Sequence, residues 1–251
     1  MMQQHKSVSS KTPSLPNPIY YHAMYHLLNT EDSWVEFVND WNDTLNYSQK
    51  DIDRFSPFLH NHHCFKNSKV LDLGCNLGYS LIFAKHLGAD KVTGIEARDH
   101  WISAGQKVLD QYGDNDIILL NRDVNDLINL AVQVSQHDMI VCMGLFYHLN
   151  NHVQFLETMI SSPGVHTIMI ESLLLDDLNH DKRPAVYFLS ESVQDPLNAY
   201  SDSATTAFVG APNIRWFREI FDIYGWKISA IHVTENPEWN PKRFCITAHK
   251  K

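Results

Sequence analysis

The chain has 251 residues, of which 44% are hydrophobic and 11% aromatic, so one α/β domain with an elaboration is its expected size. Its formal net charge is −9 and no run of Lys or Arg exceeds two residues, which argues against a broad nucleic-acid-binding surface. No stretch approaches the roughly 20 apolar residues of a membrane span. Residues 1–18 lack the apolar core of a secretory signal, and the four cysteines form no C-x-x-C pair. These features predict a cytoplasmic protein with reduced thiols and no membrane contact.

The N-terminal part of the chain divides into two segments. Residues 1–17 are polar and rich in Ser, Lys and Gln, so we expect them to be disordered. Residues 18–66 carry helical patterns rich in aromatic residues, which predict a helical cap before the first strand. The cluster from His60 to Cys64 invites a metal site, but its residues are bunched in a loop without a partner at ligand spacing. We therefore expect no metal.

From Val70 onward, apolar runs alternate regularly with helical patterns. Strands separated by helices require crossover connections and therefore predict a parallel sheet. The expected strands are 70–73, 92–95, 117–120, 138–143 and 165–170, and the expected helices are 79–87, 100–112, 126–136 and 152–160.

The turn after the first strand reads Gly74-Cys75-Asn76-Leu77-Gly78. Small side chains at Gly74 and Gly78 allow a ligand to approach the turn backbone, but the dinucleotide pattern G-x-G-x-x-G is absent. Asp72, just before the turn, would repel a pyrophosphate and suits a ligand with an amino group and a sulfonium. Glu96 follows 24 residues later, about the spacing that places a carboxylate against a ribose.

Chemically active or small residues recur where the expected parallel strands end. In parallel α/β sheets, ligands bind at the carboxyl ends of the strands. The residues at these positions are Asp72, Glu96, Asp123, Gly144 and Glu171. Their shared placement predicts one ligand site along this edge of the sheet.

The last third of the chain departs from the alternation. Residues 172–213 mix prolines, polar residues and aromatic residues, and an insertion of this length is usually functional or mobile. A helical pattern at 214–224 and two apolar runs at 226–234 and 243–249 follow. The short polar loop between these runs predicts a hairpin-like terminal pair.

Two stretches resemble motifs of the class I S-adenosylmethionine (SAM) methyltransferases. The turn after Asp72 is similar to motif I, an acidic residue followed by x-G-x-G-x-G, with Asn76 at the middle glycine. Asn is the non-glycine residue that best tolerates a left-handed backbone. The stretch 138–149, which contains Tyr147-His148, resembles motif IV of the subgroup that includes the tRNA wobble-uridine carboxymethyltransferase and many small-molecule methyltransferases.

This resemblance implies a Rossmann-like domain over residues 67–251, with a seven-stranded, mostly parallel sheet and an antiparallel last strand. In such enzymes, N-terminal helices often cover the substrate side, although packing against the sheet edge explains any single residue equally well. The resemblance likewise implies that 172–213 is a substrate-side insertion.

The resemblance also implies roles by position. Asp72 would lie near the amino group of SAM, Glu96 would bind the ribose hydroxyls, and Asp123 would accept from the adenine amino group. Other cofactor contacts would come from Gly74, Asn76, Gly78, Ala97, Arg98, Val124, Met143, Gly144 and Leu145. The product would be S-adenosylhomocysteine (SAH).

The candidates for catalysis follow the fourth and fifth strands. Histidine as a residue type titrates near neutral pH, so His148 is a candidate general base, and Tyr147 is a candidate for binding the substrate or the SAM carboxylate. Alternatively, both residues only cap the following helix. Glu171 is a second candidate for a base or for binding a cationic substrate.

The leading hypothesis is therefore a SAM-dependent methyltransferase acting on oxygen or nitrogen of a small molecule or short peptide. The runner-up is a tRNA-modifying enzyme of the wobble-uridine type. A third possibility is a SAM-binding partner protein without catalysis. The sequence leaves the acceptor atom, the oligomeric state and the role of the insertion open.

Overall fold

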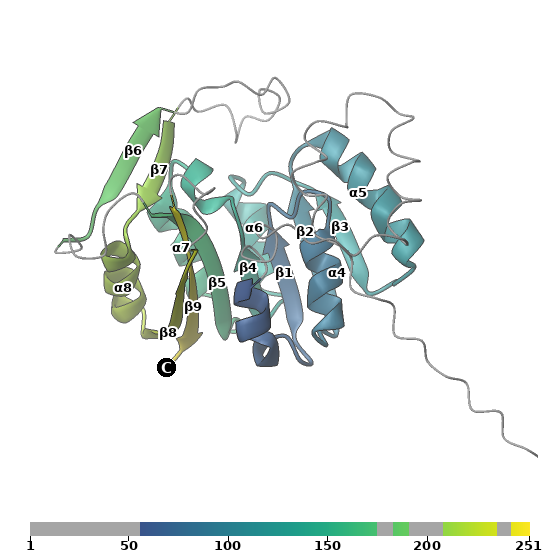
Figure 1. The fold of residues 1–251 in the computed structure, drawn as a ribbon, viewed down its shortest axis with the longest axis horizontal. Coiled ribbons are helices and arrows are strands. Elements are labelled where there is room, and N and C mark those ends of the chain that lie inside the picture. The colour runs from purple at the N-terminus through teal and green to yellow at the C-terminus, as the bar shows by residue number, and fades with distance from the viewer. Residues whose placement is uncertain (1–55, 175–182, 191–207, 235–241) are drawn as a thin grey trace, which may run out of the picture.

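The computed structural model describes residues 56–174, 183–190, 208–234 and 242–251 (Figure 1). Residues 1–17 and most of the expected helical cap lie outside this part of the chain. At the end of the cap, residues 56–60 are helical and the short 3-10 helix η1 spans His62–Cys64. Phe58 is buried there, with its ring 5.1 Å from the ring of Phe65 and 5.7 Å from that of Phe83.

A mixed seven-stranded sheet forms the centre of the described structure, in the order β3-β2-β1-β4-β5-β9-β8. Its strands are β1 (Lys69–Leu73), β2 (Lys91–Glu96), β3 (Ile117–Asn121), β4 (Met139–Cys142), β5 (Thr167–Leu174), β8 (Trp226–Val233) and β9 (Lys242–Lys250). The first five strands are parallel, and β9 runs antiparallel to both of its neighbours, β5 and β8. The expected Rossmann-like sheet with an antiparallel last strand is thus confirmed.

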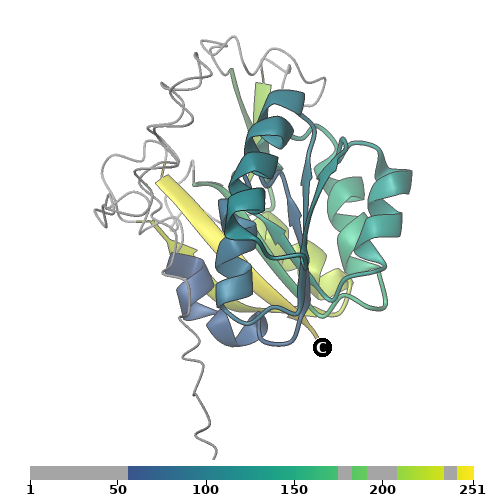
Figure 2. The ribbon, with the colours of Figure 1, turned by 90° about the vertical axis from the view of Figure 1, so that its right-hand side faces the viewer.

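Helices cover both faces of this sheet (Figure 2). They are α4 (Tyr79–His86), α5 (Asp99–Tyr112), α6 (Leu127–Val134), α7 (His152–Ile160) and α8 (Ile214–Ile223). Buried residues of α4 and α5 form one apolar core with one sheet face, and those of α6, α7 and α8 form a second core with the other. Apolar residues on both faces explain why the parallel strands are near-continuous hydrophobic runs. Within the described part of the chain, no helix is long and apolar enough to cross a membrane.

The observed fifth strand differs from the sequence prediction. We expected it to end at Ile170 with Glu171 beyond its end, but β5 continues to Leu174. β5 is longer than expected because all eight of its residues pair with β9. The pairing runs from Thr167 opposite His249 to Leu174 opposite Lys242. Glu171 therefore lies within the strand, opposite Cys245.

The insertion contains a two-stranded hairpin that the sequence did not predict. Its strands are β6 (Val186–Ser190) and β7 (Phe208–Pro212), which pair in antiparallel fashion. The hairpin lies at the end of the molecule where the parallel strands have their carboxyl ends (Figure 1). There β7 contacts β5 and the short 3-10 helix η2 (Phe146–His148) that follows β4. A Cβ atom at Gly210 would lie 2.5 Å from a ring carbon of His152, so only glycine allows this close approach.

His152 should make stability pH-dependent. Burial lowers the pKa of His152, whose ring packs beside Phe146 and Trp216. Below about pH 6.5 the unfolded chain binds this proton more readily than the folded chain does, so the stability is complete above that pH and falls below it. We expect His152→Gln to reduce the slope of unfolding free energy against pH by up to ~1.4 kcal/mol per pH unit between about pH 6.5 and 5. Urea unfolding across this range measures the slope, and an unchanged slope would contradict the assignment.

Candidate active site

The turn between β1 and α4 has three left-handed positions. Gly74, Asn76 and Gly78 have φ angles of 73°, 54° and 81°. Asn76 thus adopts the backbone conformation expected of the glycine that it replaces. The amide N–H groups of Gly74 and Cys75 donate to the Ile95 carbonyl at 2.8 and 3.0 Å, which fixes the turn beside the end of β2.

This turn lies at the topological switch point of the sheet. Strands β1, β2 and β3 extend the sheet in one direction and β4 and β5 in the other, and ligands of parallel α/β sheets bind at such a point, beyond the carboxyl ends of the strands. A Cβ atom at Gly74 would lie 3.1 Å from the Leu145 side chain, which follows β4. The segments that follow β1 and β4 therefore lie close together.

The left-handed conformation of Asn76 leads to a stability prediction. Asn76→Val places a β-branched residue at a φ of 54° and should lower the free energy of unfolding by about 1–2 kcal/mol. Asn76→Gly should change it by less than about 1 kcal/mol, because glycine adopts this conformation without strain. Urea denaturation of the two variants measures the difference. Equal losses of unfolding free energy in the two variants would show that the missing side-chain contacts of Asn76, rather than backbone strain, cause the destabilisation.

Glu96 is buried at the end of β2 and is held on several sides. Its Oε2 accepts from the Asn76 amide at 3.2 Å, and its Oε1 accepts from the Arg98 amide at 3.0 Å. The Arg98 guanidinium donates to both carboxylate oxygens, at 2.8 and 3.1 Å, and lies 5.5 Å from the ring centroid of Trp101. Ala97, between the two charged residues, is half-buried. The carboxylate is thus fixed next to the turn, and Arg98 is its ion-pair partner.

Two other predicted acids have local partners. Asp72 is buried and accepts a hydrogen bond from the Ser80 hydroxyl, which links β1 to the first turn of α4. Asp123 accepts from the backbone and side-chain amides of Asn125, at 2.9 and 3.0 Å, in the loop after β3. Val124 beside it is buried. The cofactor roles of these residues stay predictions.

The segment after β4 carries the acceptor-side candidates. Met143 is buried, Gly144 has a φ of 74°, and the side chain of Leu145 lies close to Gly74. Tyr147 and His148 lie in η2 with their ring centroids 4.3 Å apart. Tyr147 is buried and His148 is half-buried, so the histidine is the more accessible of the two.

Arg243 is a residue of this site that the sequence did not single out. Its Nη1 donates to the Glu171 Oε1 at 2.7 Å, and its guanidinium lies 5.1 Å from the ring centroid of Tyr147. The side chains of Arg243 and Glu171 are only 15% and 5% exposed. Burial works against the charged guanidinium, but its interactions with Tyr147 and Glu171 outweigh burial and raise the pKa of Arg243. Glu171 is therefore an ion-pair partner in this structure, an arrangement that suits binding better than proton transfer.

The described residues also bear on metal binding and thiol chemistry. Within them, no three His, Cys, Asp or Glu side chains come together as a group that could hold a metal. None of the four thiols is in a disulfide. Burial raises the pKa of the thiols of Cys75, Cys142 and Cys245, which disfavours a thiolate nucleophile.

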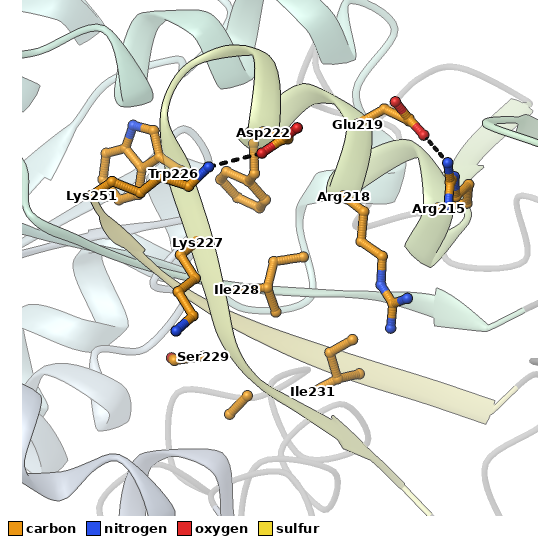
Figure 3. Close-up of a pocket in the computed structure, with 12 residues that line it drawn as sticks. Arg215, Arg218, Glu219, Asp222, Trp226, Lys227, Ile228, Ser229, Ile231 and Lys251 are labelled. Atoms are coloured by element: carbon orange, nitrogen blue, oxygen red, sulfur yellow. Dashed lines mark hydrogen bonds and ion pairs between the residues drawn. The ribbon is translucent and has the colours of Figure 1, made fainter.

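A groove of about 790 Å³ lies away from the carboxyl ends of the parallel strands (Figure 3). It is bordered by α8 and by β8, the strand at the edge of the sheet. Its charged side chains include two ion pairs, Arg215 with Glu219 and Lys251 with Asp222. None of the predicted site residues lines it.

The residues at the carboxyl ends of β1 and β2 are of the types that suit SAM. Glycines at positions 74 and 78 let the methionine part of the cofactor approach the turn backbone. Glu96 is held beside this turn by the Asn76 amide, at the end of β2 where such folds place the carboxylate that binds a ribose. The buried carboxylates of Asp72 and Glu96 favour a ligand with positive charge over a pyrophosphate.

Comparison with known proteins agrees with this geometry. The family described as a methyltransferase domain matches residues 42–230. A tRNA U34 carboxymethyltransferase of Pseudoalteromonas translucida is 26% identical over 144 residues, which are 57% of this chain and 41% of the relative. The enzyme of the same name from Campylobacter hominis is 28% identical over 137 residues, which are 49% of this chain and 46% of the relative. The chain thus spans less than half the length of these relatives.

Solved structures share the fold. The N-terminal domain of EvdMO1 with SAH and D-fucose has a TM-score of 0.57 at 16% identity, over 82% of this chain and 86% of that domain. The magnesium protoporphyrin IX methyltransferase of Synechocystis PCC 6803 with bound SAM has a TM-score of 0.55 at 12% identity, over 92% and 96%. The 1,6-didemethyltoxoflavin-N1-methyltransferase of Burkholderia thailandensis with bound SAH has a TM-score of 0.56 at 14% identity, over 93% and 90%. With its motif turn at the switch point of the sheet and a family match over most of its length, the chain belongs to the methyltransferase-domain family.

Proposed function

We propose that the chain methylates an oxygen or nitrogen atom of a small molecule or a short peptide. The proposal depends most on the contact between the β6–β7 hairpin and η2. There, Ala211 of the hairpin packs against Tyr147 and Leu173. Because the hairpin covers the residues around Tyr147, the acceptor side suits a compact substrate. Two of the similar structures are named for small-molecule acceptors, magnesium protoporphyrin IX and 1,6-didemethyltoxoflavin. The net charge of −9 also disfavours a large polyanionic substrate.

In this proposal, the cofactor would be held by residues at the carboxyl ends of the first four strands. Bound SAM supplies a methyl group on a positively charged sulfur, which makes that carbon electrophilic. The turn from Gly74 to Gly78 holds the methionine part, with Asp72 near its amino group. Glu96 would hold the ribose, Asp123 and Val124 would bind the adenine, and Met143, Gly144 and Leu145 would lie on the side of the sulfonium.

The remaining task of the chain is to align the acceptor and to remove its proton. Good alignment of the reacting atoms supplies about 7–11 kcal/mol in favourable cases. His148 is the general base, because it is the more accessible of the two residues in η2 and histidine is a common general base. Tyr147, which lies beside it, orients the acceptor.

The runner-up is a tRNA-modifying enzyme. Its support is the name of the two relatives and the Tyr147-His148 match in the resembling motif. A substrate of this size would need a positively charged surface around the site. The net negative charge of the chain disfavours binding of a nucleic acid, so this candidate ranks second.

A labelled-methyl transfer assay separates the candidates. Wild-type protein is incubated with SAM and either a small-metabolite pool or bulk tRNA, at low and high salt. We expect label in the small-molecule fraction, and the loss of that label in His148→Gln at unchanged SAH affinity. Label in tRNA alone would establish the runner-up. SAH binding without transfer to either pool would indicate a SAM-binding partner protein.

A further inference from the structure

The two strands of the β6–β7 hairpin sort their side chains onto two faces. In an antiparallel pair, directly opposite residues share a face, and neighbours along a strand alternate. Phe188 lies opposite Gly210, and Tyr187 lies opposite Ala211. Tyr187 and Phe188 therefore point to opposite faces of the hairpin.

One face packs against the start of α7. A Cβ atom at Gly210 would lie 2.5 Å from a ring carbon of His152 and 3.1 Å from a ring carbon of Phe188. Phe188 shares this face, although 64% of its surface remains exposed. This side of the hairpin is thus directed away from the acceptor-side residue Tyr147.

The other face is directed toward the acceptor side. Ala211 is buried in a cluster with Tyr147 and Leu173. Tyr187 lies directly opposite Ala211 on the same face and is half-buried. Opposite side chains in an antiparallel pair have Cβ atoms about 4.5–5.5 Å apart, within reach of a tyrosine ring. Tyr187 therefore lies beside the residues that pack around Tyr147.

Aromatic and charged groups meet at this point. The ring of Tyr147 has the Arg243 guanidinium 5.1 Å from its centroid, and that guanidinium is paired with Glu171 at 2.7 Å. Tyrosine side chains combine a large flat apolar surface with a polar tip, so they favour ring-shaped partners. The buried ion pair next to them offers both hydrogen-bond donors and acceptors.

We propose that Tyr187 forms a wall of the acceptor site, and that the acceptor presents a flat aromatic ring to Tyr147 and Tyr187 and a hydrogen-bonding group to the Arg243–Glu171 pair. This inference rests on the proposed function and names its substrate class. It also gives the inserted hairpin a role, because Tyr187 comes from the segment that interrupts the regular alternation of the fold.

Two ring probes test the proposal without knowledge of the natural acceptor. Naphthol and its saturated counterpart decahydronaphthol carry the same hydroxyl, but only naphthol is aromatic. Saturation-transfer NMR with excess SAH present should show naphthol bound to the wild-type protein and decahydronaphthol bound more weakly. Tyr187→Leu, which keeps apolar volume in place, should weaken naphthol binding about 2- to 13-fold, the range for an aromatic pair beyond its buried area. Tyr187→Ala, which also removes the apolar volume, should weaken naphthol binding at least as much.

Phe188→Ala is the matched control, because it removes an aromatic ring from the opposite face of the same strand. It should leave naphthol binding unchanged. Calorimetry should give the same SAH affinity for the wild type and all three variants. Unchanged naphthol binding in both Tyr187 variants, or equal binding of the two probes by the wild type, would overturn the inference and leave the proposed function intact. Failure of the wild type to bind SAH would instead overturn the proposed function, and this inference with it.

Discussion

Glu96→Ala should lower the affinity for SAH by about 150-fold or more. A carboxylate that accepts hydrogen bonds from two ribose hydroxyls loses both in this variant, and each hydrogen bond to a charged group contributes about 1.5–3 kcal/mol. Glu96 is buried beside the motif turn and already held by the amides of Asn76 and Arg98, so it is fixed before the ligand arrives. Isothermal titration calorimetry measures the change.

The variant also removes the ion-pair partner of Arg98, so the fold needs its own control. Thermal unfolding should show that Glu96→Ala is folded at the temperature of the titration. Asp110→Ala, which removes an exposed acid from α5, should bind SAH as the wild type does. Retention of wild-type affinity by folded Glu96→Ala would contradict the ribose assignment.

Arg243→Met should lower the free energy of unfolding by about 3–5 kcal/mol. Removing one partner of a buried ion pair leaves the other charge uncompensated, and this carries a cost of that size. Glu171 and Arg243 form such a buried ion pair, because their side chains are 5% and 15% exposed and their charged atoms are 2.7 Å apart. Urea unfolding monitored by tryptophan fluorescence measures the loss.

Two further variants isolate the buried charge as the cause. The double variant Arg243→Met with Glu171→Met should recover most of the stability, because no buried charge remains. Arg215→Met breaks a surface pair with Glu219, whose side chains are 44% and 42% exposed, and should change stability by less than about 1 kcal/mol. A loss in Arg243→Met no larger than that in Arg215→Met would show that Glu171 is solvated in solution.

The sequence was sufficient for the parts of the fold that depend on local pattern. Apolar runs alternating with amphipathic ones predicted all five parallel strands within a few residues of their observed bounds. The turn could also be predicted, because a left-handed backbone restricts residue choice, and Gly74, Asn76 and Gly78 all adopt it. Helix ends followed the same logic, since Gly113 closes α5 with a φ of 75°.

Features set by pairing between distant segments could not be predicted in this way. The ion pair between Glu171 and Arg243 joins residues 72 positions apart in the chain. β5 extends beyond its expected end because β9 continues the ladder, which no local pattern reveals. The hairpin strands β6 and β7 are separated by residues 191–207, so no short turn signal marks their pairing.

The most direct test of the cofactor assignment is the calorimetric titration of the wild-type protein with SAM and with SAH. We expect both to bind with a Kd in the micromolar range, which corresponds to about −8 kcal/mol. This result would establish that the turn with Asn76 at its centre holds the cofactor. Absence of binding by the folded protein would contradict the account, because it would mean that Asn76 has disabled the turn or that the cofactor is a modified SAM.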